Sequence, residues 1–237
     1  MPRRPRYRKS ALEGLLVVDK PLGWSSMDVV RRVRHAAGFV KTGHAGTLDP
    51  LATGVVVCCL GRATRAVEAL MAQPKRYETV IDLSAFTSTD DREGPREEVV
   101  VDRPPTEAEI DEALQGFVGE IEQAPPAYSA IHVEGKRAYD LARAGEQVEL
   151  PKRVVRVDGI QRLGYAWPEL TLAIDCGKGF YVRSLARDLG ARLGCGGHLA
   201  SLRRTAVGEY DLSRAVGPER LMEPIGADDL WPTPPLP

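Results

Sequence analysis

The sequence has few cysteines and no long apolar run. Its four cysteines, Cys58, Cys59, Cys176 and Cys195, include no C-x-x-C pair, which argues against a zinc knuckle. A reduced, cytoplasmic protein is the simplest interpretation of these thiols. The longest apolar run, residues 54–60, is too short to cross a bilayer and is typical of a buried strand. No apolar segment follows the basic N-terminus, so we expect neither a secretory signal nor a membrane protein.

The sequence also lacks a strong net charge, since 32 basic and 33 acidic residues give −1. The charges are nevertheless unevenly distributed: residues 88–122 contain twelve acids and three bases, a net of −9, so the rest of the chain carries +8. Phosphate binding requires clustered basic residues and not a basic protein overall. The alternative is that these side chains are merely solvated. The candidates for phosphate contacts are Arg31, Arg32, Arg34, Arg62, Arg65, Lys75, Arg76, Lys136, Arg137, Lys152, Arg153, Arg203 and Arg204.

The most informative segment is residues 43–54, which read Gly-His-Ala-Gly-Thr-Leu-Asp-Pro-Leu-Ala-Thr-Gly. Pro50 disfavours helical geometry at Asp49, and the glycines permit positive φ and a close approach of backbone. We therefore expect Asp49 on a shaped loop, pointing away from the core. Taken alone, a motif this short is more often a glycine-rich connector than a functional site.

Further motifs follow in order along the chain. They are Val18-Asp-Lys-Pro-Leu-Gly-Trp-Ser-Ser26, Lys75-Arg-Tyr77, Thr87-Ser-Thr-Asp-Asp91, Pro126-Ala-Tyr-Ser-Ala130 and Lys178-Gly-Phe-Tyr-Val-Arg183. Together with residues 43–54, these motifs resemble the bacterial tRNA pseudouridine synthase B family, which modifies the T-loop uridine at tRNA position 55. The resemblance covers about residues 12–210 in register, which makes it far more specific than any single motif.

The resemblance implies three catalytic residues. Asp49 is implied as the catalytic carboxylate, and Arg183 as the cation that pairs with it. Tyr77 is implied to stack on the uracil, with its hydroxyl near the reacting sugar. Without the resemblance, Arg183 would be interpreted as a solvated arginine on a helix and Tyr77 as a core residue of a strand. The family reaction uses no cofactor or metal, and we expect none.

The resemblance also implies residues that contact or support the substrate. The target uridine lies in the folded elbow of tRNA and must be flipped out of its stack. We expect His44 to occupy the vacated space, and Tyr181 and Leu202 to line the uracil pocket, although both could also be ordinary core residues. The full expected substrate-binding set is His44, Lys20, Gly46, Thr47, Tyr181 and Leu202.

Hydrophobic patterning predicts an α+β fold with one largely antiparallel mixed sheet flanked by helices, and the resemblance implies the pseudouridine synthase fold. We expect a basic arm at residues 1–11, a catalytic domain at 12–217 with a thumb-like insertion near 124–152, and a poorly ordered proline-rich tail at 218–237. Many family members carry a C-terminal RNA-binding domain of the PUA type. The tail is too short for it, so we expect a form without that domain.

Hydrophobic periodicity also predicts the positions of the strands and helices. Strands are predicted at 15–18, 55–60, 76–83, 128–133, 153–162 and 169–176. Helices are predicted at 27–37, 63–71, 106–117, 138–143 and 180–193, with Thr106 opening the third through a capping box.

Two other functions remain open. One is a non-catalytic RNA-binding protein that keeps the fold, although the joint presence of Asp49, Tyr77 and Arg183 argues against it. The other is a metal-dependent phosphohydrolase that uses the Asp49 segment with Asp82, Asp90 and Asp91 as ligands, and chelators would inactivate such an enzyme. The expected partner is the T-arm of tRNA. We expect a monomer with no obligate protein partner.

Overall fold

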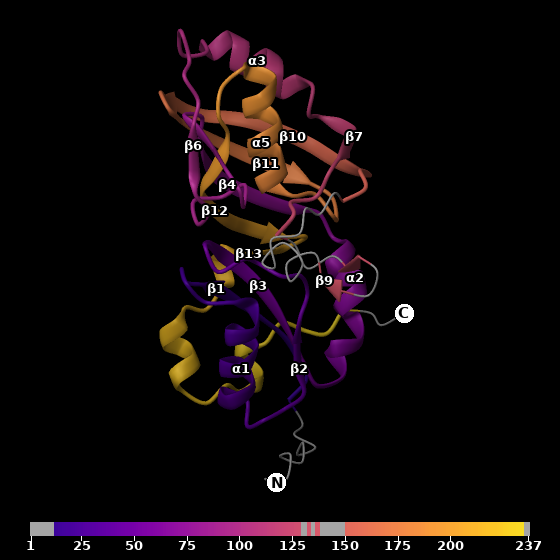
Figure 1. The fold of residues 1–237 in the computed structure, drawn as a ribbon. Helices are drawn as coiled ribbons and strands as arrows, with labels where there is room; N and C mark the ends of the chain where they lie inside the picture. The colour runs from indigo at the N-terminus through magenta and orange to yellow at the C-terminus, as the bar shows by residue number, and fades with distance from the viewer. Residues whose placement is uncertain (1–11, 129–131, 134–135, 138–149, 235–237) are drawn as a thin grey trace. The chain divides into compact units, whose positions relative to one another are not determined.

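The computed structural model describes residues 12–128, 132–133, 136–137 and 150–234, and the chain divides into two compact units (Figure 1). The first unit contains residues 1–77 and 203–237, and the second contains residues 78–202. Two strands cross the boundary in sequence: β4 (Lys75–Asp82) starts in the first unit, and β12 (His198–Val207) ends in it.

The first unit is built on two apolar strands, β1 (Gly14–Lys20) and β3 (Ala52–Leu60), which pair antiparallel along the whole of β1. Nearly all their residues are buried, so both faces of the pair are covered, as their continuous apolar sequences require. β12 and the short β2 (Thr42–His44) also pair with β3, and β13 (Tyr210–Asp211) pairs antiparallel with the end of β12.

The helix α1 (Ser26–Ala36) lies beside β1 and β2. Ser25 caps its N-terminus by accepting a hydrogen bond from the backbone N of Asp28, and the Asp28 carboxylate bonds back to the Ser25 backbone. The helix predicted at 63–71 is two elements. It begins as the 3-10 helix η1 (Gly61–Ala66) and continues as the short α-helix α2 (Val67–Ala72).

Residues 212–234 contain three 3-10 helices, η2 (Leu212–Arg214), η3 (Pro218–Met222) and η4 (Ala227–Asp229), and η2 and η3 contact β1. Leu15 and Trp231 exchange two backbone hydrogen bonds, of 3.0 and 2.8 Å. The Trp231 ring also makes an edge contact with Tyr210, at 5.3 Å between centroids. The expectation of a poorly ordered tail is therefore wrong for residues 218–234. Its prolines break regular helix, but the segment satisfies the exposed backbone of β1.

The second unit contains four strands in the order β4–β11–β10–β7, with β7 at Gly119–Gln123, β10 at Arg153–Ala166 and β11 at Glu169–Cys176. The antiparallel pair predicted at 153–162 and 169–176 is confirmed as β10 and β11. Two helices accompany these strands, α3 (Glu107–Gln115) and α5 (Val182–Leu193), and α3 packs against both α5 and β10.

Two short hairpins complete the second unit. One pairs β5 (Ala85–Thr87) with β6 (Arg96–Glu98), and the other pairs β8 (His132–Val133) with β9 (Lys136–Arg137). Most of the expected thumb-like insertion lies outside the described residues, and so does the whole of its predicted helix at 138–143. Of its predicted strand at 128–133, the described part includes β8. The α+β class with a largely antiparallel mixed sheet and flanking helices is confirmed. Among the helices that are described, none has the length and apolar character needed to span a membrane.

Candidate active site

The Asp49 segment is a loop anchored in the core of the first unit. It leaves β2 at His44 and enters β3 at Ala52. Ala45, Leu48 and Leu51 are buried, whereas Asp49 between them is half-buried. The apolar side chains at every third residue therefore hold the loop down and leave the carboxylate at its surface.

Lys20, at the end of β1, holds the loop just after Asp49. Its side chain is 0% exposed, and its Nζ donates to the carbonyl oxygens of Trp24 at 2.6 Å, Pro21 at 3.1 Å and Pro50 at 3.4 Å. Burial lowers the pKa of Lys20 to about 8, and the nearby Asp49 carboxylate opposes this shift. Lys20 therefore holds the loop at Pro50 and places a cation near Asp49.

Arg204, on β12, holds the loop just before Asp49. Its guanidinium is 2% exposed and donates from three nitrogens: Nε to Val55 O at 2.7 Å, Nη2 to Gly46 O at 3.2 Å and Nη1 to Thr47 O at 3.3 Å. Arg204 was one candidate for a phosphate contact, but its buried guanidinium bonds to the loop instead. Arg204 lies on the same face of β12 as Leu202 and Ala206, because alternate residues of a strand point to the same side. This apolar spacing was the pattern in the sequence that could have predicted an inward-pointing Arg204.

Ser26 holds Leu48, which lies between the loop segments bound by Arg204 and by Lys20. Its hydroxyl donates to Leu48 O at 3.1 Å and accepts from Leu48 N at 2.8 Å. Nothing in the sequence indicated this contact, because Leu48 lies 22 residues after Ser26. With Lys20 and Arg204, it leaves little freedom to the backbone on either side of Asp49.

Gly54 is required where the loop enters β3. Its φ is +102°, and a Cβ there would lie 2.2 Å from the carbonyl oxygen of Arg204. Gly46 has a φ of +106°, with space for a side chain but a backbone conformation that L residues rarely adopt. Both glycines thus have the role that the sequence suggested, which is to permit unusual backbone geometry and close approach.

His44 is half-buried on β2, opposite Cys58 of β3. Burial lowers the pKa of His44, and the Arg204 charge lowers it further, so the imidazole is neutral at pH 7. A neutral aromatic ring at the start of the loop is suited to stacking.

Arg183, in the second unit, is buried in the first turn of α5 with 6% of its surface exposed. Its Nη1 donates to Thr89 O at 3.3 Å and lies 3.5 Å from the Asp91 carboxylate. Asp91 is itself fixed, since it accepts from the Thr89 hydroxyl at 2.6 Å and from Glu93 N at 3.0 Å. Arg183 is therefore a preorganised, buried cation and not a solvated arginine on a helix.

The acids of the phosphohydrolase alternative have other structural roles. Asp90 forms an ion pair with Arg187 Nη1 at 2.9 Å. Asp82 accepts a hydrogen bond from the Ser84 hydroxyl and forms an ion pair with Arg96. Burial raises the pKa of Asp90, and the Arg187 charge opposes the shift. Within the described part of the chain, no three His, Cys, Asp or Glu side chains are grouped so that they could hold a metal ion.

Tyr181 precedes Arg183 at the N-cap position of α5. Gln123 of β7 fixes its backbone: Tyr181 N donates to Gln123 Oε1 at 2.8 Å, and Gln123 Nε2 donates to Tyr181 O at 3.1 Å. The Arg153 guanidinium lies 5.0 Å from the centre of the Tyr181 ring. Gln123 was missed because nothing near it in sequence indicates this partner. Leu202 on β12 is half-buried.

Tyr77, the remaining expected catalytic residue, is half-buried on β4. Lys75, two residues before it, was expected to contact phosphate but is nearly buried. Its Nζ donates to the carbonyl oxygens of Met71 and Gln73.

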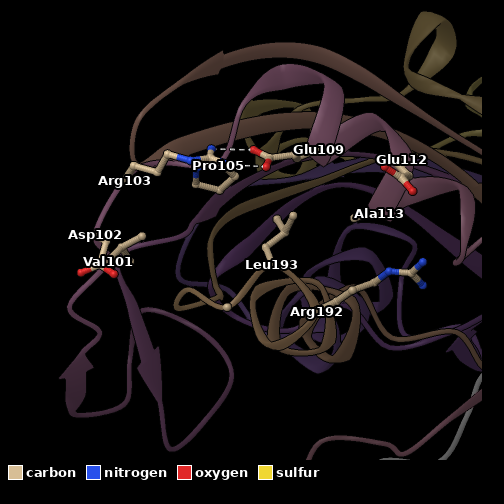
Figure 2. A pocket seen from close by; sticks show the side chains of 10 residues that line it. Val101, Asp102, Arg103, Pro105, Glu109, Glu112, Ala113, Arg192 and Leu193 are labelled. Atoms are coloured by element: carbon tan, nitrogen blue, oxygen red, sulfur yellow. Dashed lines mark hydrogen bonds and ion pairs between the residues drawn. The ribbon is translucent and has the colours of Figure 1, made fainter.

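The second unit also contains a cavity of about 550 Å³ (Figure 2). Arg103 and Glu109 form a bidentate ion pair in its wall, and Glu112 and Arg192 also line it. Its charges are mixed, and none of the predicted site residues lines it.

Comparison with known proteins identifies the family. The chain matches the TruB family pseudouridylate synthase N-terminal domain over residues 34–182 and the tRNA pseudouridylate synthase B C-terminal domain over residues 183–228. It is 51% identical over 209 residues to tRNA pseudouridine synthase B of Leifsonia xyli subsp. xyli, covering 85% of this chain and 69% of that protein. It is 49% identical over 214 residues to the Mycolicibacterium paratuberculosis protein of the same name, covering 89% and 73%.

Solved structures agree. A chain in the crystal structure of a Cbf5-Nop10-Gar1 complex is similar, with a TM-score of 0.68 and 29% identity. The match covers 87% of this chain and 52% of that one, so this chain spans about half the length of its structural relative. By its sequence matches and by its fold, the chain belongs to the TruB family of pseudouridylate synthases.

Proposed function

We propose that this chain isomerises uridine to pseudouridine at position 55 in the T-loop of tRNA, with Asp49 as the catalytic carboxylate. The observation that carries the proposal is the construction of the Asp49 loop. Two buried cations, Lys20 and Arg204, hold its backbone before and after a half-exposed carboxylate. A connector with no function would not require charged side chains to be buried beneath it. The relatives named tRNA pseudouridine synthase B support the same activity.

The reaction requires little beyond such a site. The N1–C1′ bond of uridine breaks, the uracil rotates, and C5 bonds to C1′. The proton on C5 is lost and N1 regains one, so the product is an isomer and no electrons are transferred. The carboxylate must be ionised to act on the nucleotide, and the Lys20 ammonium carries the opposite charge near it. The uracil must also be retained while it is detached, which requires a closed pocket.

The proposal also assigns roles to the other residues that the sequence predicted for the site. Arg183 pairs with the Asp49 carboxylate, a role that suits a buried guanidinium already oriented by Thr89 and Asp91. Tyr77 stacks on the uracil, and stacking of a base on an aromatic ring contributes about 1–3 kcal/mol. Tyr181 and Leu202 line the pocket, and His44 occupies the space that the flipped uridine leaves.

The substrate is the T-arm of tRNA, bound by a monomer in the cytoplasm. The four cysteines are all free and buried, which fits a reducing compartment. Arg31 and Arg32 of α1 are exposed, in contrast to Arg204, although Arg31 pairs with Asp28 and Arg32 lies over the Trp24 ring. Recognition of a folded RNA of this kind is expected to depend mainly on shape.

Tritium release tests the proposal. A T-arm transcript labelled at uracil C5 is incubated in EDTA with wild type, with Asp49→Asn, and with Asp211→Asn as a matched control. Asp211 is a carboxylate of the same unit that caps η2 through Ser213. We expect release by wild type and Asp211→Asn only. Binding of the transcript without release by wild type would favour the RNA-binding alternative, and release only when a metal is added would favour the metal-dependent one.

A further inference from the structure

Arg204 is a buried cation whose hydrogen bonds bracket Asp49. Two of its acceptors, Gly46 O and Thr47 O, precede Asp49, and the third, Val55 O, follows it in β3. The side chain thus joins the part of the loop before Asp49 to β3, the strand that follows the loop. Because three different nitrogens make the three contacts, the planar fork of a guanidinium is required. A lysine has one nitrogen and could not reach all three carbonyls.

A buried cation is expected to have an acidic partner. Within the described residues, no carboxylate lies within ion-pair distance of Arg204 or of Lys20, although both side chains are fully buried. The two cations affect each other, since the Arg204 charge lowers the pKa of Lys20. Two mutually repelling, buried cations are costly to the fold. Such a cost is reasonable where the positive potential acts on a group that reacts. Two carboxylates, Asp49 and Asp28, act on Lys20, and Asp49 has the larger effect on its pKa.

We infer that Arg204 is a positioning residue for the isomerisation, whose guanidinium closes the base of the Asp49 loop and holds the carboxylate in its reactive place. This inference rests on the proposed function, because it assumes that Asp49 reacts. It assigns a task to Arg204 that differs from that of Lys20. Lys20 holds Pro50, after the carboxylate, whereas Arg204 joins the residues before Asp49 to the strand that follows.

The test compares Arg204→Lys and Arg204→Met with Arg220→Lys. Arg220 is the matched control, since it also donates from three nitrogens, but only to Pro224 and Asp229 in the C-terminal segment. For each variant we would measure the single-turnover rate of tritium release at saturating T-arm transcript, the Kd for that transcript, and the melting temperature. All rates are measured below the melting temperature of every variant. A lower rate then reflects a displaced loop and not a loss of folded protein.

We expect Arg204→Lys to lower the single-turnover rate about 100-fold, because a displacement of about 1 Å at a reacting group has that effect. The Kd should stay near the wild-type value, because Arg204 is buried and cannot contact RNA. Arg220→Lys should lower the melting temperature and leave the rate unchanged. A wild-type rate in Arg204→Lys, or an equal loss of rate in Arg220→Lys, would overturn the inference.

Hydrogen exchange provides a readout that does not depend on catalysis. The amides of Ala45, Leu48 and Ala52 donate within or beside the loop, so they should be protected in wild type and exchange faster in Arg204→Lys but not in Arg220→Lys. Unprotected loop amides in wild type would refute the inference even if no Arg204 variant folds. If wild type releases no tritium while Arg204→Lys still loosens the loop, then the proposed function fails and the loop-holding role of Arg204 stands.

Discussion

Lys20 makes a quantitative prediction about stability and pH. Its pKa is about 8 in the folded chain, because burial disfavours the ammonium, and 10.5 is its ordinary value. Between these values the unfolded chain holds the Lys20 proton while the folded chain has lost it. The unfolded state therefore binds more protons, and stability from this group rises with pH. Between pH 7 and pH 10 the gain is about 2–3 kcal/mol, from about 1.4 kcal/mol for each pKa unit.

The perturbation is Lys20→Met, which removes the titrating group and keeps an unbranched side chain. Free energies of unfolding are measured by urea denaturation at pH 7 and pH 10 for wild type and the variant. From pH 7 to pH 10, the free energy of unfolding of wild type should rise by about 2–3 kcal/mol relative to that of Lys20→Met. Lys41→Met, which removes an exposed lysine of the same unit, controls for the loss of one positive charge.

Other buried groups do not disturb the comparison. Burial raises the pKa of Cys195 to about 11 and that of Cys59 to about 12. Both thiols therefore lower the stability of the folded chain at alkaline pH. They are present in wild type and in the variant, so their effect cancels in the difference. If the two proteins show parallel pH dependence, then Lys20 is not a buried cation and the account of the loop anchor is wrong.

Two further predictions concern packing in the first unit. Gly54→Ala should destabilise the chain by about 2–5 kcal/mol, since the φ of Gly54 is +102° and a Cβ there would lie 2.2 Å from Arg204 O. An unchanged urea midpoint would show that β3 and β12 are not close enough for this clash. Trp231→Ala should cost about 2 kcal/mol, because its ring contacts Tyr210 and lies 3.9 Å from the Arg214 guanidinium; an unaltered melting temperature would restore the prediction of a poorly ordered tail.

The elements that sequence patterns located well are those with local causes. Ser25 and Thr106 open their helices through capping boxes, whose partners lie three residues away. The apolar run of β3 is buried in the core as its composition predicts. The proline after Asp49 places this residue in a loop. The tail was misjudged for the opposite reason: its partner, β1, lies some two hundred residues earlier in the chain.

The sequence by itself determined the family, the Asp49 loop and most helices and strands, because these depend on neighbouring residues and on motifs in register. Only the tertiary structure decided which cations serve the fold and which face solvent. Arg204 and Thr47 are 157 residues apart, and Arg183 and Thr89 are 94 apart. Arg31 and Arg204 look alike in a list of basic residues, yet one is exposed and the other is buried beneath the loop. That difference arises from strand pairing across the chain, which no local pattern of residues encodes.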